Sequence, residues 1–89
     1  MKQEYKPKTI TQFKKAAGML KKVIQMAEED RYCIELLQQS LAVIGMMKGA
    51  NKIILENHLN CCFKSGMQKA SPKKQQELIE EVLHVIEKA

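Results

Sequence analysis

The chain has 89 residues, enough for one small domain, and 45% of them are hydrophobic, although only four are aromatic and none is tryptophan. A monomer would have a thin core, so this composition favours a helical protein that gains its core by oligomerising. Two prolines and four glycines argue against a turn-rich all-β fold. The net charge is +5, but residues 1–22 hold seven lysines and one glutamate, which predicts an anionic partner for this segment.

The expected location is the cytoplasm. No run of 18 apolar residues is present, so we expect no membrane-spanning segment. The first residues also lack the apolar stretch of a signal peptide. In a reducing compartment, three cysteines more often serve metal binding, redox sensing or packing than structural disulfides.

The first part of the chain is predicted to be a flexible basic arm over residues 1–8, followed by a single all-α domain over residues 9–89. A first helix is expected to begin near Thr9 or Thr11, either of which could cap it. Apolar side chains recur at helical spacing and form one stripe along this helix. They are Phe13, Ala16, Ala17, Leu20, Val23, Ile24 and Ala27.

A second, long helix is predicted from about Asp30 to about Ser65, with Gly66 as a left-handed stop. It would be roughly 50 Å long, too long for a core made by one protomer. A third helix should begin at Ser71, with Pro72 at its first helical position. The fold class is therefore all-α, with a three-helix protomer built on one long central helix. The apolar positions of the long helix are Ile34, Leu37, Leu41, Ile44, Met47, Ile54 and Leu55.

Potential metal ligands lie near both ends of the long helix. His58 and Cys62 are four residues apart, so on a helix they share a face and can reach one ion. Cys33 lies 25 residues before His58, about 37 Å along a straight helix. It can therefore join them between two antiparallel copies but not within one chain. Two thiolates and one imidazole favour Cu(I), then Zn(II), and three such ligands suit a trigonal Cu(I) centre; the alternative is that these cysteines only pack.

Other reactive side chains have weaker patterns. Cys61 points about 100° away from Cys62 around a helix, so we interpret it as a bystander or as an auxiliary redox group. His84 has no partner at ligand spacing and is interpreted as a surface or packing residue. Tyr32 precedes Cys33 and could hydrogen-bond to a residue of the metal site, or it could be an ordinary interface tyrosine. Because glycine-rich phosphate loops and Ser-His-Asp arrangements are missing, we expect neither an enzyme nor a small-molecule substrate.

Three runs of the sequence match a known family. They are Glu-Glu-Asp-Arg-Tyr-Cys-Ile-Glu-Leu-Leu-Gln-Gln at 28–39, Ala-Val at 42–43, and Leu-Glu-Asn-His-Leu with Cys62 at 55–62. Over roughly residues 10–65 the chain resembles the copper-sensitive operon repressor family of metal-sensing transcriptional repressors. The spacing of Cys33, His58 and Cys62 is that of the Cu(I)-sensing branch. The resemblance implies an antiparallel dimer that assembles into a tetramer as a dimer of dimers.

The resemblance further implies a Cu(I)-responsive repressor that binds operator DNA without a helix-turn-helix and is released in its ligand-bound form. Cys33 of one protomer would join His58 and Cys62 of its partner. Family members often place a glutamate of the third helix beside the ligands, and Glu77 and Glu81 both fall near that position. The lysines expected to contact DNA phosphates are Lys14, Lys15, Lys21, Lys22 and Lys48.

The chain departs from the family pattern mainly in its DNA-contacting residues. Many members have a Gly-Gln-Val-Arg-Gly-like run where this chain has Gly-Met-Leu-Lys-Lys at 18–22, and Ile44 replaces a common arginine. Lysine binds phosphate as a point charge but does not reproduce bidentate arginine contacts. Binding to the DNA phosphate backbone therefore survives these substitutions. They put in question which operator sequence is recognised and how tightly it is bound.

Two other functions stay open at the level of sequence. One is a thiol or persulfide sensor on the same fold, in which Cys33 and Cys62 of different protomers form a disulfide or polysulfide bridge. Persulfide sensors of the family lack the histidine that this chain has, but Cys61 keeps the sulfur chemistry open. The other is a copper-buffering helical bundle that binds no operator.

Overall fold

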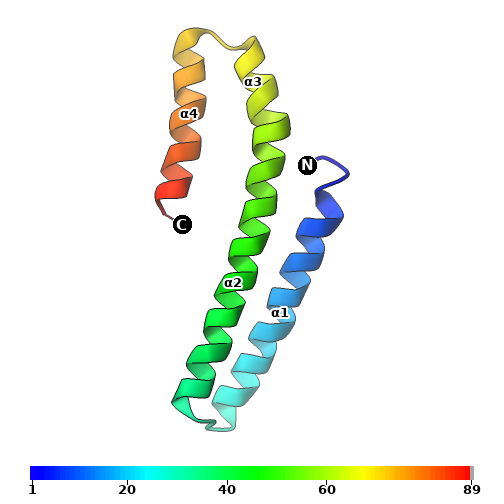
Figure 1. Cartoon of the computed structure of the whole chain (residues 1–89), viewed down its shortest axis with the longest axis vertical. Coiled ribbons are helices and arrows are strands. Elements are labelled where there is room, and N and C mark those ends of the chain that lie inside the picture. The colour runs from blue at the N-terminus through cyan, green and yellow to red at the C-terminus, as the bar shows by residue number, and fades with distance from the viewer. Residues whose placement is uncertain (89) are drawn as a thin grey trace.

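A computed structural model describes residues 1–88, and every regular element in that range is a helix. The elements are α1 (Lys6–Glu28), α2 (Cys33–Asn57), the π-helix η1 (His58–Phe63), α3 (Lys64–Lys69) and α4 (Pro72–Glu87). Because α2, η1 and α3 follow one another without a break, they form one long helical rod. Helix α1 runs antiparallel to this rod, and α4 folds back from its far end (Figure 1). The expected all-α fold around a long central helix is confirmed.

Helix α1 begins at Lys6, before either threonine that was expected to cap it. Pro7 occupies the first turn of the helix, where backbone N–H groups have no intrahelical acceptor, so its missing N–H costs no hydrogen bond. Thr9 lies inside the helix and is buried, and its hydroxyl donates to the Tyr5 carbonyl at 2.8 Å. The helix start predicted from capping was therefore wrong. Residues 1–8 include the first residues of α1, and the flexibility of a basic arm there stays a prediction.

The second helix was expected to begin at about Asp30, but Asp30 lies in the turn that ends α1, and α2 begins at Cys33. Asp30 has a left-handed backbone with φ 55°, a conformation that Asp tolerates better than most residues. Its N–H donates to Ala27 O, and the N–H of Arg31 donates to Met26 O, both at 3.1 Å. These two bonds define a Schellman motif. The N-cap of α2 is Tyr32.

The long rod does not stop at Gly66 but continues to Lys69, where the extended backbone of Ala70 ends it. A Cβ at position 66 would lie 3.2 Å from Leu78 Cδ1 on α4. Glycine at this position therefore permits close packing of α4. The prediction of a left-handed stop was wrong, because the sequence does not show that a second helix packs against this residue.

The start of α4 is as predicted. Ser71 is the N-cap, and its hydroxyl accepts a hydrogen bond from the Lys74 N–H at 3.3 Å, with Pro72 in the first turn. Gln75 Nε2 donates to the Met67 carbonyl at 2.8 Å and ties α4 to the end of the rod. These local bonds fix the direction in which α4 folds back.

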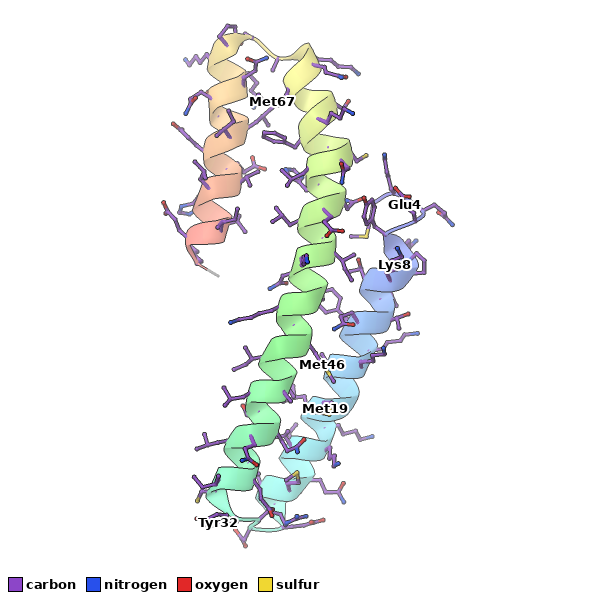
Figure 2. The ribbon with its side chains drawn as sticks, in the orientation of Figure 1. Glu4, Lys8, Met19, Tyr32, Met46 and Met67 are labelled. Atoms are coloured by element: carbon purple, nitrogen blue, oxygen red, sulfur yellow. The ribbon has the colours of Figure 1, made fainter. Side chains whose placement is uncertain are left out.

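The core of the protomer is a seam between α1 and α2. Its members alternate at three- and four-residue spacing, as in a coiled coil. On α1 they are Thr9, Gln12, Ala16, Met19, Val23 and Met26; on α2 they are Leu36, Gln39, Val43, Met46, Ala50, Ile53 and Asn57. Met19 and Met46 lie between the two helices (Figure 2). Ala16 and Ala50 are buried, and their small side chains let the two helices approach closely.

A second apolar stripe, shifted by one or two positions from the seam, is exposed. We call it the open face: Ile10, Phe13, Leu20 and Ile24 on α1, and Ile34, Leu37, Leu41, Ile44 and Met47 on α2, all between 37% and 65% exposed. Since the helices run antiparallel, residues that follow seam positions turn toward the same side of the hairpin. An apolar surface of this extent marks an interaction site. No helix in residues 1–88 has the length and apolar character needed to cross a membrane.

Candidate metal centre

Cys33 is the first residue of α2, directly after the turn that closes the hairpin, and its thiol is exposed. The preceding residue, Tyr32, has a side chain that is 69% exposed (Figure 2), and its carbonyl accepts the Leu36 N–H at 3.1 Å. Arg31 and Glu35 form an ion pair of 2.9 Å beside it. Cys33 therefore lies on an open surface at one end of the molecule, where a second chain can reach it.

His58 and Cys62 lie in η1, a π-helix that the sequence did not predict. In an α-helix four residues slightly exceed one turn. The wider i→i+5 turn of a π-helix brings the fourth residue just short of a full turn, so these two side chains still project from one side. His58 is half-buried, with its ring centroid 6.2 Å from that of Phe63, and Cys62 is exposed. Single π-helical turns occur frequently at functional sites.

The structure brings His58 and Cys62 together and leaves Cys33 at the other end of the rod. The long axis of the protomer measures 56 Å, and α1 and α2 extend along it (Figure 1). Among residues 1–88, no three His, Cys, Asp or Glu side chains are grouped closely enough to hold one metal ion. One protomer therefore carries two candidate ligands at one end and a third at the opposite end.

The residues expected to support the ligands divide between the same two ends. Tyr32 lies beside Cys33. Glu77 and Glu81 belong to α4, which turns back beside the far end of the rod (Figure 1). Both glutamates are exposed, and Glu77 pairs with Lys74 at 3.5 Å.

Two asparagines close to His58 in the chain have no functional signal in the sequence. Asn57 is 5% exposed, and its Oδ1 accepts the backbone N–H of Lys2 at 2.9 Å. Asn60 Nδ2 donates to the Tyr5 hydroxyl at 3.2 Å and to the Glu56 carbonyl at 2.9 Å. The heptad spacing of the α2 seam indicates that Asn57 is buried, but no sequence pattern indicates that its side chain binds the N-terminal turn.

Of the remaining reactive side chains, Cys61 is half-buried and His84 is exposed near the end of α4. An apolar groove of about 490 Å³ lies at the end of the rod formed by η1 and α3. Its walls are Leu59, Phe63, Lys64, Met67 and Gln68. The ligand-bearing end thus has uncovered apolar surface beside its sulfur and imidazole groups.

The five lysines expected to contact DNA are all exposed. Lys15 and Lys22 occupy positions just before seam residues, so they face the side opposite the open face. We call that side the basic face; it also includes Lys8 (Figure 2) and Lys52, which the sequence reading left out, as well as Gly18 and Gly45. A Cβ on either glycine would meet nothing within 4 Å, so this face is smooth. Lys14, Lys21 and Lys48 each lie two positions from seam residues, so they project away from the seam, between the basic face and the open face.

The chain is all-helical and carries two cysteines and one histidine as candidate soft metal ligands near the two ends of its rod. Residues 5–88 match the family model of the metal-sensitive transcriptional repressors, and the chain belongs to that family. The resemblance noted from the sequence is therefore confirmed. Members of this class are transcriptional regulators rather than enzymes.

Several curated relatives are copper sensors. The chain is 36% identical to the copper-sensing transcriptional repressor CsoR of Mycobacterium ulcerans over 58 residues, which are 65% of this chain and 50% of the relative. It is 29% identical to CsoR of Bacillus subtilis over 83 residues, 93% of this chain and 79% of the relative. The copper-sensing repressor RicR of Mycobacterium tuberculosis is 29% identical over 59 residues, 66% and 62% of the two chains. The chain thus spans about half the length of the mycobacterial CsoR proteins that it matches.

Proposed function

We propose that this protein is a cytoplasmic Cu(I)-responsive transcriptional repressor. In the metal-free form it binds operator DNA, and it releases the DNA when Cys33 of one protomer and His58 and Cys62 of its partner bind Cu(I) together. The observation that carries the proposal is the position of these ligands at opposite ends of one helical rod, in a chain of the repressor family. The copper-sensing relatives support the choice of metal.

The donor chemistry of the three residues fits this ion. Two thiolates and one imidazole are soft ligands, which favour Cu(I) over oxygen-preferring cations. A structural zinc site normally takes four ligands, so a set of three fits Cu(I) better. When bound, the ion would supply a link between two chains. Tyr32 and either Glu77 or Glu81 would orient the ligands by hydrogen bonds.

The open face supports pairing of two protomers. Its nine side chains are on average about half exposed, and covering the rest of each would contribute about 1 kcal/mol. Two such faces in contact would yield on the order of 10–20 kcal/mol, compared with roughly 4–15 kcal/mol of lost translational and rotational freedom. An antiparallel pairing would bring Cys33 of one chain to the ligand-bearing end of the other. A dimer of dimers would complete the tetramer.

The basic face supports binding to DNA phosphates. Its lysines form a row along α1 with Lys52 on α2, and the smooth glycine surface permits close approach of a phosphate backbone. A dimer that pairs through the open faces keeps the basic faces outside. Ligation would favour a different packing of the helices with lower DNA affinity. A useful release requires a coupling of a few kcal/mol, because 1.4 kcal/mol changes affinity about tenfold.

An anaerobic Cu(I) titration against a competing chelator, followed by an electrophoretic mobility shift with the upstream DNA of the gene, tests the proposal. We expect one Cu(I) per protomer, two sulfur ligands by X-ray absorption, and loss of the DNA complex on addition of Cu(I). The Cys61→Ala variant is the matched control and should behave like the wild type. Copper binding that is unchanged in Cys33→Ala would refute the site.

The same assays separate the other functions that the sequence allows. If Cu(I) does not release the wild-type protein from DNA, and persulfide still releases the His58→Ala variant, a thiol sensor would replace the copper sensor. If the protein binds copper but no operator at low salt, a copper-buffering bundle would replace the repressor. Operator binding that does not weaken with salt would contradict the phosphate contacts, because counterion release requires a steep loss.

A further inference from the structure

The N-terminal turn, residues 2–5, is fastened to the ligand-bearing end of the rod (Figure 1). The backbone N–H of Lys2 donates to Asn57 Oδ1 at 2.9 Å, and Asn60 Nδ2 donates to the Tyr5 hydroxyl at 3.2 Å. Each bond joins residues 55 positions apart in the chain. Asn57 immediately precedes His58, and Asn60 follows it within η1. The turn is therefore held by the residues that flank a proposed ligand.

Asn57 makes this attachment specific. It is one of two buried polar side chains in residues 1–88, and the Lys2 N–H is the partner that the structure gives its amide oxygen. A buried amide that loses its partner destabilises the state that contains it. Any motion that carries the turn away from the rod must therefore also move Asn57 or open its surroundings to water.

The turn is also joined rigidly to α1. The Lys2 carbonyl accepts the N–H groups of Tyr5 and Lys6, both at 3.1 Å. The Tyr5 carbonyl accepts the Thr9 N–H at 3.0 Å and the Thr9 hydroxyl at 2.8 Å. The position of the turn consequently fixes Lys2 and Lys6, two of the positive charges nearest the start of α1.

We propose that Asn57, Asn60 and Tyr5 form a latch that couples ligation at His58 and Cys62 to the basic N-terminal turn. This inference rests on the proposed function. In the π-helical register of η1, Asn57 reaches Lys2 while Asn60 reaches Tyr5. A partner's Cys33 that joins His58 and Cys62 on one centre approaches the η1 turn that also carries Asn60, and so moves Asn60 relative to Asn57 at the end of α2. Both bonds then cannot persist, and the lysines of the turn are released from their fixed positions.

Because ligation breaks the latch in this proposal, the latch opposes ligation. If ligation lowers the equilibrium constant for closing the latch by some factor, linkage requires that loss of the latch raise the affinity for Cu(I) by up to the same factor. One side-chain hydrogen bond corresponds to about a two- to tenfold change. A merely structural role for these asparagines gives the opposite sign, because a loosened ligand segment would bind more weakly.

The test combines hydrogen exchange by mass spectrometry with a competition titration of Cu(I), both on the full chain. In the wild type, one equivalent of Cu(I) should speed the exchange of amides in residues 2–9 by about two- to tenfold. Asn60→Ala and Asn57→Ala should show that faster exchange already without metal and should bind Cu(I) more tightly by a similar factor. Gln38→Ala, which removes an exposed amide of α2 on the side away from the open face, is the matched control and should change neither quantity.

Tyr5→Phe removes only the hydroxyl acceptor and serves as a second variant if Asn57→Ala does not fold. Combining Tyr5→Phe with Asn60→Ala should have no more effect than Asn60→Ala alone, because both delete the same bond. Unchanged exchange in the presence of bound Cu(I), or weaker Cu(I) binding by the variants, would overturn the latch and leave the proposed repressor intact. No binding of Cu(I) in the titration would overturn the repressor proposal and, with it, the coupling.

Discussion

The separation of the proposed ligands allows a complementation experiment with two inactive variants. Cys33→Ala removes the ligand at one end of the rod, and Cys62→Ala removes one at the other end. Each variant alone should lose Cu(I) binding, since every site in its homodimer lacks one sulfur. A mixed dimer has one site with all three residues intact and a second site with both defects. Mixing the two variants should therefore restore binding.

The geometry sets the magnitude of this restoration. Cys33 and His58 are 25 residues apart in a continuous helical rod, about 37 Å along its axis, so no rearrangement of one chain short of unfolding the rod makes them neighbours. Random exchange makes half of the dimers mixed, each with one site, so about one Cu(I) should bind for every four protomers. The wild type should bind about one Cu(I) per protomer under the same conditions.

The assay is a chelator competition at equal total protein, after the two variants have been mixed under conditions that allow subunit exchange. A mixture of Cys33→Ala with Cys33→Ala/Cys62→Ala is the control and should bind no Cu(I), because its mixed dimers contain no Cys33. If the complementing mixture bound no more Cu(I) than the separate variants, while native mass spectrometry showed mixed dimers, the intersubunit site would be refuted. Full binding by Cys33→Ala alone would refute it as well.

The remaining predictions concern the surface, the DNA and the helix ends. Leu41→Glu on the open face should dissociate the oligomer in sedimentation experiments, because a charge would replace apolar surface at the contact, whereas Gln38→Glu on the other side should leave it assembled. Lys15→Ala and Lys22→Ala should each weaken operator binding and reduce the slope of log K against log salt by about 1, whereas an unchanged slope would argue against phosphate contacts. Ser71→Ala should lower the free energy of unfolding by about 1 kcal/mol in thermal denaturation, through loss of the bond to the Lys74 N–H, and no change would mean that water replaces this cap.

Elements with local signals were predictable from the sequence. The Ser-Pro pair at 71–72 specifies the start of α4 through its own hydroxyl and ring, so neighbours along the chain suffice. The distance between Cys33 and His58 follows from helical rise alone, once the absence of proline between them indicates a continuous helix. The sequence therefore predicted a candidate ligand set and the need for a second chain before the fold was known.

The sequence predicted a single apolar stripe along the first helix, and this was wrong, because the structure divides those residues between the seam and the open face. Phe13, Leu20 and Leu41 have the larger side chains, but Ala16 and Ala50 form the seam. Small residues at facing positions let two helices approach closely, and this choice depends on both helices together. The same holds for Gly66, which has a helical neighbour in place of a left-handed backbone.

By itself, then, the sequence determined an all-helical chain, the start of its last helix, and the long separation of Cys33 from His58 and Cys62, the three candidate metal ligands. The tertiary structure decided that Asp30 ends α1, that residues 58–63 adopt a π-helix, and that Asn57 holds the N-terminal turn. The physical reason is the range of the interactions. Helical periodicity and capping depend on residues a few positions apart, whereas the seam and the attachment of the turn depend on groups as many as 55 positions apart.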